Sequence, residues 1–490
     1  MYKRKSPQMT MFETPENFMM LSGLDPNNRW VKMSKLIPWD LVEEKYAKSF
    51  KETPFSRPAK PARMAIGTQI IKEKYVLSDE ETVEMITENP YLQYFIGLEH
   101  FTNQAPMEAS VLTLFRKRIT PEMLAEVNDY IIGRKKNDDD NDPPSGSGKT
   151  DVDQSGEKEE TNKGTLILDA TCVPSDIRFP TDISLLNQGR EWLEGIIDEQ
   201  HSKDMTNGQK PRTYRQVARK EYMRFARNRK PSRKVIRKAK RKQLGYISRD
   251  LKAIEACGTE GLSQASLERL EVAKKVYEQQ KQMYDTNTQK VDDRIVSLNQ
   301  PWVRPIVRGK ATAKTEFGAK IAVSVLDGYF RIEHLSWDAF NEANTLEETV
   351  ERYKEKTGFY PRRILADKIY RNRDNLQYCK KRNIHMSGPK LGRPPKDREL
   401  YAQQCRDERR EAGERNEVEG KFGTGKRCYG MNRITARLKD TSETQIHMIV
   451  LTMNLWKKMK SSFALFCRWC GLRRLMLIEG RGVDLLPMAV

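Results

Sequence analysis

The first 136 residues carry apolar positions at helical spacing. Residues 61–77 follow the pattern of one helix with an apolar face. Ser78, with Glu81 three residues later, forms a capping box that predicts the start of a second helix, and Pro90 predicts its end. Short helices with tight connections are typical of a helix-turn-helix. We therefore predict an all-helical N-terminal domain over residues 1–136.

Two later runs of strand type each carry one carboxylate. The run Thr165–Val173 encloses Asp169, and the run Arg363–Ala366 is followed directly by Asp367. A carboxylate in an apolar strand is costly to desolvate unless it is paired, hydrogen-bonded or metal-bound. Both acids are therefore site candidates. For a lone strand aspartate, the alternative is a structural role in which hydrogen bonds satisfy the carboxylate.

The pattern between these two strands changes twice. Residues 185–300 are mostly helical in pattern and predict a helical insertion. Asp327 and Gly328 lie between two β-rich runs and predict a hairpin, because a type I′ turn needs φ > 0 at both central positions. A helix follows, with Thr345 as its expected cap and Gly358 as its end.

The insertion contains a strongly basic stretch. Sixteen Lys or Arg residues lie between Lys210 and Lys242, interleaved with tyrosine and phenylalanine, and Pro231-Ser232 marks a break with an N-cap. We predict one strongly basic helix that contacts DNA phosphates, the alternative being a merely solvated face. The residues assigned to this contact are Arg224, Arg227 and Arg237.

Charge is unevenly distributed along the chain. The net charge is +20, whereas residues 137–160 alone carry −7, so the rest carries +27. We interpret residues 137–164, rich in Asp, Gly, Ser and Glu, as an acidic disordered linker. The basic remainder favours a partner with a phosphate backbone, and a solvated basic surface is the alternative.

Cysteine usage and hydropathy bear on location. Seven cysteines, an odd number without framework spacing, argue against a disulfide-stapled secreted protein and predict a cytoplasmic one. No run reaches the roughly eighteen uninterrupted apolar residues of a membrane span, so we expect no membrane partner.

With the insertion set aside, the element order resembles a ribonuclease-H-like domain: three antiparallel strands, a crossover helix and a parallel strand beside the first. We therefore predict an α/β fold with a mixed sheet over residues 165–460 and a C-terminal tail over 461–490. In that fold the first and fourth strands are neighbours, so Asp169 and Asp367 would meet. Glu419 follows in a segment with helical spacing.

Five stretches together resemble the DDE transposases of bacterial insertion sequences. DATCVPSDIRFPTDISLL and ADKIYRN are similar to the motifs of the two aspartates. RNEVEGKFGTGK is similar to the glutamate motif, with Arg415, Glu419 and Lys426 at R-x₃-E-x₆-K. The stretch ending SVLTLFRKRI resembles the N-terminal domain of the family, and FGAKIAVSVLDGYFRI resembles its core hairpin.

This resemblance implies an enzyme that cleaves DNA strands and joins them to a target. Asp169, Asp367 and Glu419 would be catalytic and would hold two Mg²⁺ ions, for which Mn²⁺ can substitute. Arg415 and Lys426 would contact phosphates, the alternative being ordinary ion pairs on a helix surface. The partners would be double-stranded DNA, as inverted-repeat ends and target, and a second copy in a homodimeric DNA complex at the bacterial nucleoid.

The basic end of the N-terminal domain is also assigned to DNA, with an ordinary helical bundle as the alternative. The residues concerned are Arg116, Lys117 and Arg118. Two positions depart from the family pattern: Ala412 replaces the tyrosine of YREK, and Ile369 replaces the glycine of DKGY, where a β-branched residue would disfavour a φ > 0 turn. Rival functions are a ribonuclease-H-like nuclease that only cleaves and a non-catalytic DNA-binding protein derived from a transposase.

Helical geometry distinguishes two neighbouring acids. At about 100° per residue, Glu419 lies about 40° around a helix from Arg415, whereas Glu417 lies about 200° away. Glu419 is therefore the expected member of the site. Lys426 would share this face only if the helix continued past three glycines, each of which costs about 1 kcal/mol relative to alanine. These glycines are Gly420, Gly423 and Gly425.

Overall fold

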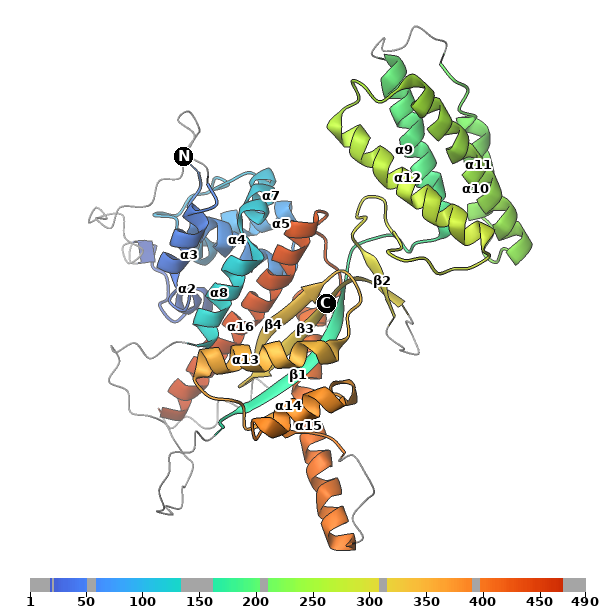
Figure 1. The fold of residues 1–490 in the computed structure, drawn as a ribbon. Helices are drawn as coiled ribbons and strands as arrows, with labels where there is room; N and C mark the ends of the chain where they lie inside the picture. The colour runs from blue at the N-terminus through green and yellow to red at the C-terminus, as the bar shows by residue number, and fades with distance from the viewer. Residues whose placement is uncertain are drawn as a thin grey trace, which may run out of the picture.

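The computed structural model describes residues 18–19, 22–50, 59–133, 162–202, 210–307, 315–389 and 397–469, with residues 462–469 described by their backbone alone. The described chain is a mixed α/β protein with one six-stranded mixed sheet, helices against both faces, and a group of helices set apart from the sheet (Figure 1). The predictions for residues 137–161 and 470–490 lie outside these ranges.

The sheet is built around its first strand. That strand, β1, pairs antiparallel with β3 and parallel with β5, and β5 pairs in parallel with β6. Both β2 and β4 pair antiparallel with β3. The strands are β1 (Thr165–Pro174), β2 (Arg304–Val307), β3 (Thr315–Leu326), β4 (Tyr329–Ser336), β5 (Arg363–Leu365) and β6 (His385–Met386). The β3–β4 hairpin turns at Asp327 and Gly328 with φ of 49° and 73°, which confirms the predicted turn.

Each face of the sheet buries a separate apolar cluster, because alternate residues of a strand point to opposite faces. Leu166 and Leu168 of β1 pack with helices α13 (Leu346–Thr357) and α14 (Arg373–Lys381). Ile167 and Val173 belong to the larger cluster on the other face, the face of Asp169. Two long helices, α15 (Arg398–Cys428) and α16 (Lys439–Trp469), contribute to that cluster.

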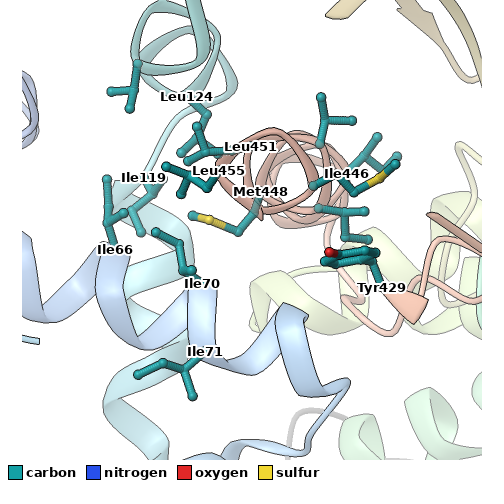
Figure 2. Packing of buried hydrophobic residues seen from close by; sticks show 14 of the residues in the cluster. Ile66, Ile70, Ile71, Ile119, Leu124, Tyr429, Ile446, Met448, Leu451 and Leu455 are labelled. Carbon is teal, nitrogen blue, oxygen red and sulfur yellow. The ribbon is translucent and has the colours of Figure 1, made fainter. Parts of the chain in front are cut away.

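The N-terminal helices join the larger cluster. Isoleucines of α4, Ile119 just before α8 and Leu124 within α8 pack in one cluster with Met448, Leu451 and Leu455 of α16 (Figure 2). The capping box is present, since Ser78 accepts from the Glu81 amide and Glu81 from the Ser78 amide. The helices are α2 (Arg29–Ser34), α3 (Trp39–Ala47), α4 (Ala62–Tyr75), α5 (Asp79–Glu88), α6 (Pro90–Phe95), α7 (Ala109–Arg118) and α8 (Pro121–Ile132). Their separation as a domain at residue 136 stays a prediction.

The helical insertion lies between β1 and β2 and has an apolar cluster of its own, with Leu193, Ile247 and Ile254 at its centre. It consists of α9 (Asp182–Ser202), α10 (Arg215–Ala226), α11 (Arg233–Cys257) and α12 (Gln264–Asp285). The prediction of one strongly basic helix was wrong, because the basic stretch is divided between α10 and the first turns of α11. The division falls at Pro231, and Ser232 caps α11 by accepting from the Val235 amide, as expected.

Helix α13 begins differently from the prediction. A 3₁₀ turn, η1 (Glu342–Thr345), leads directly into it, so Thr345 already has helical backbone angles. The Thr345 hydroxyl donates back to the Glu342 carbonyl and makes no cap. Gly358 ends the helix in the left-handed conformation, with φ of 83°, as the sequence predicted.

Candidate active site

Asp169 lies on β1, and Asp367 lies just after β5, the parallel strand beside β1. The β1–β5 register pairs Thr165 with Arg363 and Ile167 with Leu365. Each acid lies two residues beyond the second of these pairs, so the register, continued, sets the two aspartates side by side. Each aspartate comes two residues after a residue of the larger apolar cluster, Ile167 or Leu365. Side chains two residues apart along a strand point to the same face, so we expect both carboxylates on the face of that cluster. Residues that are 198 positions apart in sequence are thus brought together by strand pairing.

Asp169 is a largely buried carboxyl, with a side chain that is 16% exposed. Its Oδ1 accepts the Ala170 amide at 2.8 Å, and its Oδ2 lies 3.6 Å from Nη1 of Arg415. Burial raises the pKa of Asp169 to about 6, while the Ala170 amide and Arg415 act in the opposite direction. The charge of Asp367 contributes to the rise, which shows that the two carboxyls interact electrostatically.

Asp367 starts the turn that follows β5. It is the N-cap of a 3₁₀ turn, η2 (Lys368–Tyr370), and its carboxylate accepts the Lys368 amide at 2.7 Å. Ile369 lies within this turn and is absent from the residues with positive φ in the described chain. The expected conflict between Ile369 and a φ > 0 turn therefore does not arise, because the backbone here is one that a β-branched residue adopts.

Helix α15 runs along the face of the sheet that carries Asp169. Val418 and Phe422 belong to the larger cluster, and on the same side Lys426 Nζ donates to Thr171 Oγ1 at 3.2 Å. The helix is continuous through Gly420, Gly423 and Gly425 to Cys428. A Cβ on Gly425 would lie 3.1 Å from the Met431 sulfur, so this glycine permits the close packing of α15 that outweighs its poor helix propensity.

Glu419 shares the side of α15 that carries Arg415. Its Oε1 lies 3.6 Å from Nη2 of Arg415, and its side chain is 61% exposed. Glu417 lies elsewhere, since its carboxylate is next to Gly328 and lines a cleft of about 520 Å³ between the sheet and α15. The wall of this cleft includes Ile167, which lies two residues before Asp169 on β1. The predicted difference in direction between Glu417 and Glu419 is confirmed; a role for Glu419 stays a prediction.

The three acids suit a hard cation by the chemistry of their donors, because carboxylate oxygens are the ligands that Mg²⁺ prefers. Asp169 provides such oxygens from β1, and Asp367 provides them from the turn after the adjacent strand β5. The guanidinium of Arg415 lies against both Asp169 and Glu419 and so supplies the positive charge between them. As the described side chains stand, no three His, Cys, Asp or Glu residues are grouped to hold a metal ion.

One acid near the site was missed by the sequence analysis. Glu342 of η1 contributes to the raised pKa of Asp169 and of Tyr370, a buried residue of η2. Its Oε1 is paired with Lys320 Nζ at 2.8 Å. The sequence around Glu342 gave little indication that this acid lies near the site, because Glu342 is in a short turn after the hairpin and belongs to no motif.

The N-terminal candidates for DNA contact have different environments. Arg116 makes a bidentate pair with Asp79, at 2.8 and 2.7 Å, and its side chain is 15% exposed. These contacts give Arg116 a structural role that the sequence did not predict. The Arg118 guanidinium lies 4.4 Å from the centre of the Phe50 ring, and Lys117 is exposed.

The insertion candidates are exposed. Arg224 lines a groove of about 370 Å³ between α10 and α11, together with Tyr222 and Phe225. Arg227 follows the end of α10, and Arg237 donates to Asn287 Oδ1 at 3.0 Å and lies 4.3 Å from the centre of the Tyr284 ring. Ala218 is the one buried residue of α10, so the surface of the helix exposes its basic side chains together with the apolar Val217 and Met223.

None of the helices in the described part of the chain has the length and apolar character that a membrane crossing requires.

Comparison with known proteins gives two family matches, both to transposases. Residues 364–456 match a model described as a transposase DDE domain, and residues 19–118 match one described as a transposase domain (DUF772). The first range contains Asp367, Arg415 and Glu419.

A curated relative from Rhizobium meliloti, described as uncharacterized protein ORF8 in nfe locus, is 39% identical over 104 residues. The match covers 21% of this chain and 49% of the relative, so the chain spans about half the length of that protein. No solved structure matches the chain.

Proposed function

Because the two matched regions identify the chain as an insertion-sequence DDE transposase, we propose that it binds transposon ends, cleaves them and joins them to target DNA through Asp169, Asp367 and Glu419. The observation that supports this proposal is the register of β1 and β5, whose last pair, Ile167 with Leu365, lies two residues before each aspartate. An ordinary structural role does not require a largely buried aspartate on one strand and an exposed aspartate directly after the neighbouring strand.

The strand order supports assignment of the sheet to the ribonuclease-H-like class. Read along the sheet, β4, β3, β1, β5 and β6 are neighbours, and of these five described strands β3 alone runs antiparallel to the others. The insertion after β1 and the added strand β2 leave this order unchanged. In open sheets of this kind, sites form where the central strands end.

Each member of the site has a role that follows from its position. Asp169 presents an oxygen donor from the sheet, Asp367 presents one from the turn after β5, and the exposed Glu419 can adjust to a bound DNA strand. A bound pair of divalent cations supplies activation of the attacking hydroxyl and stabilisation of the leaving 3′-oxygen. Lys426, held over β1 by Thr171, brings a positive charge to the phosphate on that side.

The basic surface of α10 and α11 supports a role in holding the DNA duplex. Its exposed arginines and lysines match a phosphate backbone, whose neutralisation releases counterions and dominates affinity. Tyr222 and Phe225 in the adjoining groove add flat apolar surfaces beside these charges. We assign Arg224, Arg227 and Lys117 to such contacts, and Arg237 to the edge of the same surface.

A strand-transfer assay with precleaved ends tests the proposal. The wild-type protein is expected to join a 3′-hydroxyl end to a target duplex with Mg²⁺ or Mn²⁺ and to lose the reaction with either aspartate replaced. Cleavage without joining would favour the nuclease alternative. Binding with neither reaction, under conditions in which both metals were tried, would favour the non-catalytic alternative.

A further inference from the structure

We propose that Arg415 is an internal counter-cation of the acidic site: its guanidinium bridges Asp169 and Glu419 when no divalent cation is bound, and metal binding releases it toward DNA phosphate. The inference rests on the proposed function, because it treats these acids as metal ligands. It adds that the metal must compete with a residue of the protein itself.

The bridge uses two nitrogens and two acids from different elements. Nη1 of Arg415 lies 3.6 Å from Oδ2 of Asp169 on β1, and Nη2 lies 3.6 Å from Oε1 of Glu419 on α15. The side chain of Arg415 is 23% exposed, so solvent reaches it. One guanidinium therefore neutralises part of the charge of a strand acid and a helix acid together.

The distances differ from those of two bidentate arginine pairs of the same chain. Arg116 binds Asp79 at 2.8 and 2.7 Å, and Arg215 binds Asp198 at 2.9 and 2.7 Å, both in bidentate geometry. Charge-assisted bonds of that length are the strong class. At 3.6 Å to each acid, Arg415 is held by charge without a short hydrogen bond to either, which suits a contact that exchanges.

The site needs a positive charge in some form. Asp169 is only 16% exposed, and the Arg415 guanidinium, 3.6 Å away, offsets the negative charge of its carboxylate. A divalent cation held by these acids would repel the guanidinium and would take over that task. The released Arg415 remains on α15, one helical turn from Glu419, where a planar guanidinium can grip a phosphate.

The consequence is a positive coupling between metal and DNA. In the free protein, metal binding must break the Arg415 bridge, and this cost lowers the affinity for the metal. Once DNA phosphate holds Arg415, the acids are left without their internal cation and bind metal more tightly. Coupling of this kind is reciprocal, so metal must strengthen DNA binding by the same factor.

The test is a titration of the full chain with Mn²⁺ in the absence of DNA, in which isothermal titration calorimetry measures the affinity for Mn²⁺. Arg415→Gln should bind Mn²⁺ at least about fivefold more tightly than the wild type, the lower end of typical coupling. Arg415→Lys, which keeps the charge, should stay near the wild type. Arg409→Gln is the matched control, because it removes one positive charge from an exposed position of the same helix. Unchanged or weaker Mn²⁺ binding by Arg415→Gln would overturn the proposal.

Two further measurements keep the outcomes distinct. Asp169→Asn and Asp367→Asn should lose Mn²⁺ binding; if both bind it like the wild type, the proposed active site fails. If both aspartate variants lose Mn²⁺ binding while Arg415→Gln gains no Mn²⁺ affinity, the proposed role of Arg415 fails and the proposed active site stands. Arg415→Met, which keeps an apolar stem for packing, replaces the glutamine variant if that one unfolds. With a mixed-sequence duplex present, the wild type should gain Mn²⁺ affinity and Arg415→Gln should gain none.

Discussion

Arg363 and Glu414 connect the strand that leads to one candidate acid with the helix that carries another: Nη2 of Arg363 on β5 lies 2.6 Å from Oε2 of Glu414 on α15. Asp367 follows this strand, and Glu419 lies five residues beyond Glu414. Arg363 also donates to Thr165 Oγ1 at 2.7 Å, so the pair joins β1, β5 and α15 at one end of the cleft.

We expect this pair to position α15 more than to stabilise the fold. Both side chains are about one-third exposed, so Glu414→Gln should lower the free energy of unfolding by only about 0.5–1 kcal/mol. Strand transfer should fall further, by about tenfold, since a small displacement of catalytic groups is costly. The double variant Arg363→Glu with Glu414→Arg should recover part of the activity. Equal activity of Glu414→Gln and wild type would show that the pair is incidental.

Replacement of either strand acid should abolish chemistry and leave DNA binding intact. Asp169→Ala and Asp367→Ala each remove a fixed oxygen donor, and we expect strand cleavage and joining to fall by at least about 100-fold, as for loss of a preorganised electrostatic group. Gel-shift affinity for duplex DNA should change less than twofold. An Asp367→Ala protein that retains a tenth of the wild-type cleavage would remove that residue from the site.

Glu417 and Glu419 provide a matched pair for the third acid. Glu419→Gln should remove catalysis with little change in thermal stability, because the side chain is exposed and its ion pair with Arg415 is long. Glu417→Gln should retain most activity, since its carboxylate faces Gly328 and the cleft. The reverse pattern in a Mg²⁺-dependent cleavage assay would overturn the R-x₃-E-x₆-K assignment.

Charge reversal on the insertion should flatten the salt dependence of DNA binding. Removal of one phosphate contact should reduce the slope of log K against log salt by about 0.9. The test variant changes four exposed bases to Glu: Lys220, Arg224, Arg227 and Lys238. The control reverses four bases on the far part of α11 and on α12: Lys252, Lys274, Lys275 and Lys281. If both variants change the slope equally, net charge and not this surface governs binding.

The insertion should lose stability as pH rises toward neutrality. Asp250 is 3% exposed, and burial, followed by the charge of Glu194, raises its pKa from 3.8 to about 7. Because the folded-state pKa of Asp250 lies above the unfolded value, its contribution to the free energy of unfolding is fully present below about pH 4. That stability is lost as pH rises through about 7 and the buried carboxyl must ionise. Asp250→Asn imitates the protonated form.

We therefore expect Asp250→Asn to exceed the wild type in unfolding free energy by on the order of 3 kcal/mol at about pH 8, with the difference shrinking toward about pH 4. Urea unfolding across this range measures it. Asp198→Asn is the control, because Arg215 and Lys210 lower the pKa of Asp198 to about 2 and its titration lies below the range. A pH-independent difference for Asp250→Asn would contradict the prediction.

The sequence by itself determined features that depend on residues a few positions apart. The Ser78–Glu81 box, the turn at Asp327 and Gly328, and the shared side of Arg415 and Glu419 all follow from local backbone geometry. Local rules failed where a neighbouring element competed, as at Thr345, whose hydroxyl bonds to the preceding 3₁₀ turn.

Only the tertiary structure decided which distant residues meet. Strand pairing placed β1, which carries Asp169, beside β5, which precedes Asp367, and the pairing of Arg116 with Asp79 took that arginine into the fold. Packing against Met431 carried α15 through Gly425, at which helix propensity alone argues for an end. Propensity and periodicity sum over neighbours along the chain, whereas burial, ion pairing and register depend on partners that the fold brings together.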